Sequence, residues 1–176
     1  LVAASLALAG CALPVGGSGN GSSNGSHASG ATGQQPADFV ALTTLAPGIV
    51  QDMRYHGAHN FLGRPVAGYA AARCLLTQPA VRALQAAQAE LAPQGLALKV
   101  FDCYRPQAAV DDFVRWGRDS RAPENTKAAY YPEVPKAQLE QRGFITPQSS
   151  HSRGSAVDLT LVVTDAVRAA QVLQGP

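Results

Sequence analysis

Residues 149–161 read SSHSRGSAVDLTL, and this stretch decides the fold because it holds His151 and Asp158 seven positions apart with Gly154 between them. A regular strand would place two residues at that spacing on opposite faces and far apart. Glycine adopts backbone conformations that are closed to other residues, so the chain can turn at Gly154. We therefore expect His151 on a loop and Asp158 on a strand over residues 156–163, both directed at one point.

An imidazole and a carboxylate directed at one point are typical of a zinc site. A catalytic zinc ion takes three protein ligands and keeps an open position for water. His151 and Asp158 supply two of the residue types that such a site uses. A serine-rich turn with a solvated histidine explains the same residues. The choice between this turn and a zinc site depends on the rest of the chain.

The second informative stretch covers residues 96–106, LALKVFDCYRP. Residues 96–101 read as a strand, and Pro106 suits the first position of a helix over residues 107–115. Arg105 would then lie between a strand and a helix, where side chains often point into a site. The alternative is that Arg105 caps its own loop or pairs with Asp102 or Asp111.

The remaining periodicity predicts a chain of mixed structure. Apolar residues at helical spacing predict a helix over residues 79–91, which begins at a proline. A shorter helix over residues 135–142 is expected to end at Gly143. Short apolar runs over residues 39–53 indicate a strand or two, and residues 119–125 read as a loop.

Together these stretches resemble the D-alanyl-D-alanine dipeptidase family, the zinc peptidases that include the vancomycin-resistance dipeptidases. The resemblance runs from about residue 51 to about residue 163. The matching blocks are DMRY at 52–55, NF at 60–61, YRP at 104–106, YYP at 130–132 and SHSRGSAVDLTL at 150–161. It implies an α+β fold with a small, mainly antiparallel sheet and flanking helices, one zinc ion per active site, and hydrolysis of the dipeptide D-Ala-D-Ala.

The resemblance also implies roles for individual residues. His151 and Asp158 would bind the metal, and Arg105 would be catalytic by stabilising the oxyanion, since a guanidinium stays charged and donates in a fixed fork. Tyr55 and Ser149 match positions near the substrate and could offer it their hydroxyl groups. For Tyr55, a place at the edge of the core is the alternative.

The family's catalytic base and third zinc ligand come from a Glu-x-x-His motif, and no Glu or His follows Asp158 here. We expect that motif downstream of residue 176, and we expect residues 1–176 alone to bind zinc weakly and to lack dipeptidase activity. The alternative is a non-catalytic relative. His56 and His59 lie in a turn-like region, do not match the family's ligands, and read as surface residues.

The beginning of the chain indicates export. Residues 1–11 read as the remnant of a secretory signal whose LAGC at 8–11 resembles the bacterial lipoprotein cleavage box, which predicts a lipid on Cys11. An ordinary signal peptide with an incidental cysteine is the alternative. Residues 12–36 are predicted to form a flexible Gly/Ser-rich tether, and residues 37–176 the peptidase domain. We expect a lipid-anchored protein in the periplasm or on the cell surface.

Two further cysteines fit an oxidising compartment. If Cys11 carries lipid, Cys74 and Cys103 are left as a pair that could form a disulfide. Cys103 stands where the vancomycin-resistance enzymes carry glycine. A disulfide would explain that departure and would tie the turn of Arg105 to the segment before the helix at residue 79. Two buried free thiols are the alternative.

These expectations combine into one leading function. It is zinc-dependent hydrolysis of D-Ala-D-Ala at the cell envelope, in cell-wall peptide metabolism or glycopeptide resistance. The alternatives are a D,D- or L,D-carboxypeptidase acting on peptidoglycan stem peptides, and a non-catalytic lipoprotein that binds cell-wall peptides. A formal net charge of +2, with scattered basic residues, gives no indication of a nucleic-acid partner.

Overall fold

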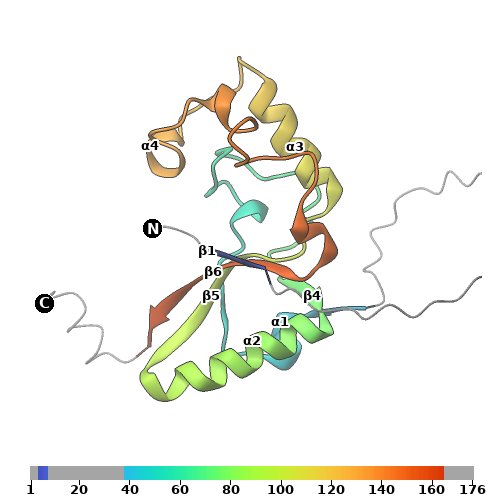
Figure 1. Ribbon diagram of the computed structural model, residues 1–176, viewed down its shortest axis with the longest axis vertical. Coiled ribbons are helices and arrows are strands. Elements are labelled where there is room, and N and C mark those ends of the chain that lie inside the picture. Colours follow the sequence, from blue (N-terminus) through green and yellow to red (C-terminus); the bar gives the residue numbers. More distant parts are fainter. Residues whose placement is uncertain (1–3, 8–37, 165–176) are drawn as a thin grey trace, which may run out of the picture.

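A four-stranded sheet lies at the centre of the computed structural model, which describes residues 4–7 and 38–164 (Figure 1). Its strands follow the spatial order β1-β6-β5-β3. Their bounds are Ala4–Ala7 for β1, Ala156–Val163 for β6, Leu96–Asp102 for β5 and Val50–Gln51 for β3. Cys11 and the predicted tether over residues 12–36 lie outside the described residues.

The strand directions make this sheet mainly antiparallel. Strand β6 runs antiparallel to both β1 and β5, whereas β3 runs parallel to β5. A second, two-stranded antiparallel sheet pairs β2 (Phe39–Ala41) with β4 (Leu75–Thr77). The expected α+β fold with a small, mainly antiparallel sheet is therefore confirmed.

Helices α1 (Leu42–Leu45) and α2 (Gln78–Leu91) cover one side of the sheet (Figure 1). The apolar face of α2, including the buried Val81 and Leu84, packs with Leu98 and Val100 of β5 in one hydrophobic core. A short 3₁₀ helix, η2 (Ala92–Gln94), ends at Gly95 and leads directly into β5. The prediction of a helix over residues 79–91 is confirmed, because its apolar spacing places one face against this core.

The opposite side of the molecule is built from helices and irregular segments around a second, aromatic core. It contains η1 (Arg54–His56), α3 (Gln107–Arg118), α4 (Lys127–Tyr130) and η3 (Lys136–Gln138). Phe113 and Trp116 on one face of α3 pack with Phe61 and Tyr131. The candidate site lies where this part meets the end of β5 and the start of β6.

The structure corrects several predicted boundaries. Helix α3 runs to Arg118 rather than to residue 115, and Pro106 precedes the helix as its N-cap instead of occupying its first position. The helix expected over residues 135–142 is reduced to the 3₁₀ helix η3, which is followed by turns up to Gly143, where φ is +77°. The short helix α4 was not predicted.

A disulfide joins Cys74, just before β4, to Cys103, just after β5, with Cα atoms 5.3 Å apart.

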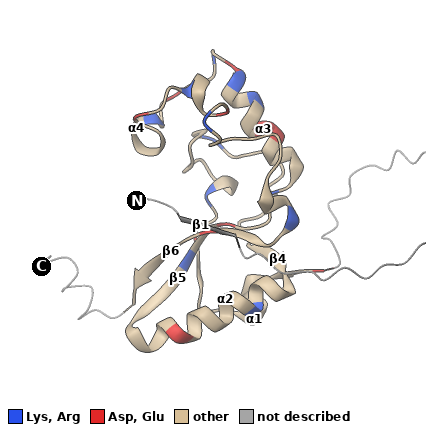
Figure 2. Cartoon of the chain, viewed as in Figure 1, with Lys and Arg blue, Asp and Glu red and all other residues tan. Residues whose placement is uncertain are grey.

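Charged residues of both signs are spread over both parts of the molecule, the part with α1 and α2 and the part with α3 and α4 (Figure 2). Within residues 4–7 and 38–164, no helix is both long and apolar enough to cross a bilayer.

Asp112 fastens α3 to the irregular segment before β4. Its buried carboxylate accepts hydrogen bonds from both terminal nitrogens of Arg64, at 2.8 and 3.0 Å, and from the backbone N–H of Ala67 at 3.1 Å. The hydrogen bonds from Arg64 are the main reason that the pKa of Asp112 is lowered to about 2. The carboxylate therefore stabilises the fold above the ordinary Asp pKa, and this contribution is lost as the pH falls from about 4 towards 2.

We expect Asp112→Asn to lower the free energy of unfolding by about 1–2 kcal/mol at pH 7, a value limited by the exposure of Arg64. Urea unfolding should show that the difference from the wild type shrinks as the pH is lowered from 4 to 2. Asp111→Asn is the matched control, because Asp111 is exposed and its carboxylate accepts a hydrogen bond from the side chain of Gln107 on the same helix. An equal loss in both variants would contradict the role of Asp112.

Candidate functional site

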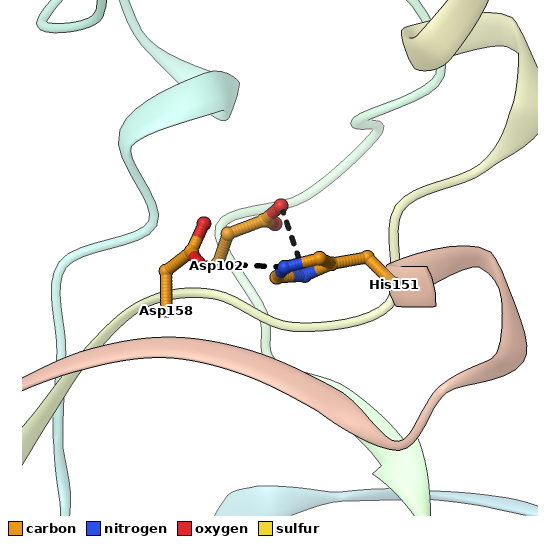
Figure 3. Close-up of side chains that lie close together, drawn as sticks. All are labelled: Asp102, His151 and Asp158. Carbon is orange, nitrogen blue, oxygen red and sulfur yellow. Dashed lines mark ion pairs between the residues drawn. The ribbon is translucent and has the colours of Figure 1, made fainter. Parts of the chain in front are cut away.

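Three side chains converge at the junction of the two halves: Asp102, His151 and Asp158 (Figure 3). Each offers one ligand atom, and these atoms lie within 4.8 Å of one another. Asp102 ends β5, Asp158 lies on β6, and His151 lies on the 3₁₀ helix η4 (Ser150–Arg153). Among the described residues this is the one cluster of His, Cys, Asp and Glu side chains with the spacing of a metal site.

Helix η4 places His151 because both of its ends are fixed. At the start, the Oγ of Ser149 accepts a hydrogen bond from the backbone N–H of His151 at 3.3 Å. At the end, Gly154 adopts a left-handed conformation with φ +71°, and its carbonyl accepts from the N–H of Thr77 on β4 at 2.8 Å. The predicted turn at Gly154 is confirmed, and it lets a loop histidine face a strand aspartate.

Gly154 is also required by packing. A Cβ atom at this position would lie 2.1 Å from the ring of Phe39 and would clash with it. We expect Gly154→Ala to lower the free energy of unfolding by about 2–4 kcal/mol, since strain and overpacking add. Gly143→Ala is the matched control: its φ is +77°, but a Cβ there meets nothing within 4 Å.

The control should lose only the conformational part, about 1–2 kcal/mol. Denaturant unfolding of the two variants measures the difference. Equal losses would mean that Phe39 moves aside without cost.

The hydrogen bond of His151 fixes its tautomer. Its Nδ1 lies 2.9 Å from the backbone carbonyl of Cys103, which can only accept, so Nδ1 carries a proton. In the neutral ring the lone pair is then on Nε2, which faces Asp158. Burial and the charge of Arg105 lower the pKa of His151, but the hydrogen bond to Asp158 and the charges of Asp158 and Asp102 together raise it more, so the net shift is upward.

The pair formed by His151 and Asp158 fits a zinc ion. The Nε2 of His151 and the Oδ1 of Asp158 are 3.4 Å apart. Two ligands bound at about 2.0–2.1 Å in a tetrahedron lie about 3.3 Å from one another, so these atoms already have the separation of two zinc ligands. The donor set, one imidazole and one carboxylate, is also one that zinc accepts.

Asp102 was considered in the sequence only as a partner of Arg105, and its place behind His151 was missed. The register of β5 and β6 shifts between Val100 and Asp102, so that Asp102 lies opposite Asp158. Such a bulge redirects side chains next to a site. The only indication in the sequence that Asp102 belongs to the site was its position at the end of a predicted strand.

The contacts of Asp102 indicate that it orients other groups rather than binding a metal. Its fully buried carboxylate accepts from the hydroxyl of Tyr69 at 2.8 Å and from Nε of Arg105 at 2.9 Å. It lies 3.6 Å from Nδ1 of His151, the nitrogen that faces away from Asp158. Burial raises the pKa of Asp102, and the charges of Arg105 and His151 oppose that shift.

Arg105 occupies the turn between β5 and α3, as predicted, and its guanidinium joins both carboxylates. It lies 2.8 Å from Asp102 and 3.4 Å from Asp158, and its NH1 group is 3.4 Å from the Oγ of Ser149. Burial lowers the pKa of Arg105, but Asp102, Tyr55 and Tyr69 together raise it more, so the group stays charged. The expected pairing with Asp102 is present, and the same side chain also reaches the site.

These groups face a cavity of about 380 Å³, a size found for small-molecule sites. Tyr55 and Ser149, predicted near the substrate, both line it together with Arg105, His151 and Asp158. Tyr55 also packs with the rings of Tyr69 and Phe113. Its side chain therefore lies at the edge of the core and lines the cavity at the same time. Burial raises the pKa of its hydroxyl.

The other histidines of the folded part do not join the cluster. His56 is exposed, and its ring lies 3.2 Å from the carbonyl of Tyr69. His59 is exposed and contacts the ring of Tyr130. Their interpretation as surface residues is confirmed.

Comparison with known proteins agrees with this geometry. Residues 35–172 match a protein-family model described as D-ala-D-ala dipeptidase. The chain is 42% identical over 129 residues to a D-alanyl-D-alanine dipeptidase of Enterococcus faecalis. The aligned region covers 72% of this chain and 62% of that protein. The chain is 44% identical over 126 residues to a protein of the same name from Streptomyces coelicolor, covering 70% of this chain and 61% of the relative.

A more distant relative of the same name, from Escherichia coli, is 32% identical over 124 residues, and the alignment spans 53% of its length. The chain thus spans about six tenths of the length of its more similar curated relatives.

Proposed function

The chain belongs to the D-Ala-D-Ala dipeptidase family of zinc-dependent peptidases, and from this premise we propose that the protein hydrolyses the dipeptide D-Ala-D-Ala. The observation that carries the proposal is the 3.4 Å approach of His151 Nε2 to Asp158 Oδ1, beside Arg105 and in a cavity of about 380 Å³. The cavity is suited to a small, polar substrate because charged groups, hydroxyl groups and aromatic rings all line it.

In this proposal His151 and Asp158 hold the zinc ion, which when bound lowers the pKa of a coordinated water to about 7 and polarises the scissile carbonyl. Arg105 donates to the oxygen on which negative charge develops, and Asp102 keeps the guanidinium directed at that point. Ser149 and Tyr55 offer hydroxyl groups to the backbone of the dipeptide.

Within the described residues, no further His, Cys, Asp or Glu side chain lines this cavity. We therefore assign the third zinc ligand and the catalytic base to residues outside the described part of the protein. The expectation that residues 1–176 alone bind zinc weakly and lack dipeptidase activity stays a prediction.

The full-length protein tests the proposal directly. We expect it to release D-alanine from D-Ala-D-Ala, to lose this activity when a chelator removes the metal, and to regain it with zinc. The stereoisomer L-Ala-L-Ala is the matched control substrate and should be cleaved poorly. Absence of hydrolysis by a folded, zinc-loaded protein would refute the proposed reaction.

A stem-peptide carboxypeptidase is the second candidate, and one observation favours it. A larger hollow of about 820 Å³ shares Tyr55, Phe61 and Asp158 with the first cavity and could receive a longer peptide. Assay on a pentapeptide ending in D-Ala-D-Ala separates the two functions. Cleavage of the pentapeptide in preference to the free dipeptide would favour the carboxypeptidase.

We also propose export, with residues 1–11 as a leader and Cys11 as the site of a lipid anchor. The apolar leader, the lipoprotein-type LAGC sequence and the Cys74–Cys103 disulfide support this location, since disulfides persist mainly in oxidising compartments. Removal of the leader would take β1 away and leave β6 at the edge of the sheet. Metabolic labelling with a radioactive fatty acid, compared between the wild type and Cys11→Ala, tests the anchor.

A further inference from the structure

The disulfide and the candidate metal site meet in one residue, Cys103. Its sulfur is bonded to Cys74, and its backbone carbonyl accepts the hydrogen bond from Nδ1 of His151 at 2.9 Å. The turn that contains it touches His151 a second time, because the backbone N–H of Arg105 donates to the carbonyl of His151 at 3.3 Å. The residue that orients the histidine is therefore the residue that is cross-linked.

The other end of the disulfide is held firmly. The N–H of Cys74 donates to the side chain of Gln51 on β3 at 2.9 Å, and its carbonyl accepts from the N–H of Leu42 on α1 at 3.0 Å. Both cysteines are fully buried in the core beneath the sheet, together with Val81 of α2. The disulfide thus attaches the turn to the hydrophobic core that contains residues of α1, α2 and the sheet.

The turn is also held on the side of the site, where the hydroxyl of Ser152 donates to the carbonyl of Arg105 at 2.9 Å and Nε of Arg105 donates to Asp102 at 2.9 Å. Residues 103–106 belong to no helix or strand, and the backbone bond from Tyr104 N–H to the carbonyl of Leu75, at 2.9 Å, is their main link to the same core. Without the disulfide, the Cys103 carbonyl would lose its covalent link to the core and gain freedom to rotate, and the ring of His151 would rotate with it. A metal ligand needs its second nitrogen held in a fixed direction, and loss of that support typically weakens metal binding about 10–100-fold.

We infer that the Cys74–Cys103 disulfide is a positioning device for the metal site: it fixes the Cys103 carbonyl, and through it the Nε2 of His151, so that zinc binding is coupled to the oxidised state of this pair. The inference rests on the proposed role of His151 as a zinc ligand. It makes Cys74 and Cys103 positioning residues, because neither of them touches the substrate or the metal.

Such a coupling acts in both directions. If the disulfide strengthens zinc binding by some factor, zinc must stabilise the disulfide against reduction by the same factor. The reduction is a two-electron exchange: a dithiol reductant is oxidised to its own disulfide, the Cys74–Cys103 bond breaks, and each sulfur gains one electron and one proton. A tenfold coupling corresponds to a shift of about 30 mV towards more negative potential when zinc is bound.

The test compares full-length wild-type protein with Cys74→Ala/Cys103→Ala, which removes the cross-link together with both sulfur atoms that form it. Zinc affinity is measured by competition with a chromophoric chelator, and Co²⁺ absorption reports the geometry of the site. We expect zinc affinity to fall at least about 10-fold and the Co²⁺ spectrum to change. Val81→Ala, in the same core but away from the site, should lose stability without either effect.

If the double variant binds zinc as tightly as the wild type, the disulfide is merely structural and the inference is overturned. Should the double variant fail to fold, a redox titration of the wild type decides. A midpoint potential that is lower with zinc than without it supports the coupling, and equal midpoints overturn it. Normal zinc coupling without hydrolysis of D-Ala-D-Ala would refute the proposed reaction alone.

Discussion

His151→Ala in the full-length protein is expected to abolish tight zinc binding and to lower the turnover of D-Ala-D-Ala by at least about 10³-fold. The imidazole holds one of the two atoms that we propose as zinc ligands, 3.4 Å from the other. A catalytic metal contributes several kcal/mol of transition-state stabilisation, and about 4 kcal/mol corresponds to a factor of 10³ in rate. Metal content measured by atomic emission and steady-state kinetics, each at saturating zinc, provide the measurement.

His56→Ala is the matched control, because His56 is an exposed histidine outside the cavity. It should keep both the metal and the activity. His151→Gln tests whether the loss comes from the ligand rather than from the fold, since glutamine retains a similar length and polarity. A His151→Ala protein that keeps its zinc and its turnover would show that the metal is bound elsewhere.

Arg105→Ala should lower kcat by about 10²–10³-fold and change KM much less, because loss of one donor to a developing oxyanion has this effect and the interaction belongs to the transition state. Arg105→Lys should also be poor, since a point charge cannot contact Asp102 and the substrate as a planar fork does. The measurement is the separate determination of kcat and KM for D-Ala-D-Ala.

The structure adds a second effect that must be separated from the first. Arg105 neutralises the buried Asp102 at 2.8 Å, so its removal also leaves a buried charge and should destabilise the fold. In Asp102→Asn/Arg105→Ala the fully buried charge of Asp102 is removed as well, and stability should largely return while kcat stays low. Arg118→Ala, which breaks an exposed pair with Glu140, is the control for removal of an arginine. Recovery of kcat in the double variant would mean that Arg105 acts only through Asp102.

The elements that local sequence determined are those whose residues carry their own periodicity or turn chemistry. Strand β6 was predicted with its observed bounds, and α2 within one residue, because an alternating run and an apolar helical face need only the chain itself. The meeting of His151 and Asp158 followed from Gly154, since one glycine is enough to turn the chain between them.

Tertiary structure decided what lies behind those two residues. The register shift between β5 and β6 brings Asp102 opposite Asp158, and a bulge of this kind depends on the pairing of two strands that are distant in sequence. The hydroxyl of Tyr69 donates to Asp102 from a segment without regular structure. Periodicity in the sequence does not predict a contact from such a segment. Sequence thus determined that His151 and Asp158 face one another, whereas long-range packing determined the groups around them, because only the folded chain fixes which distant residues share a buried space.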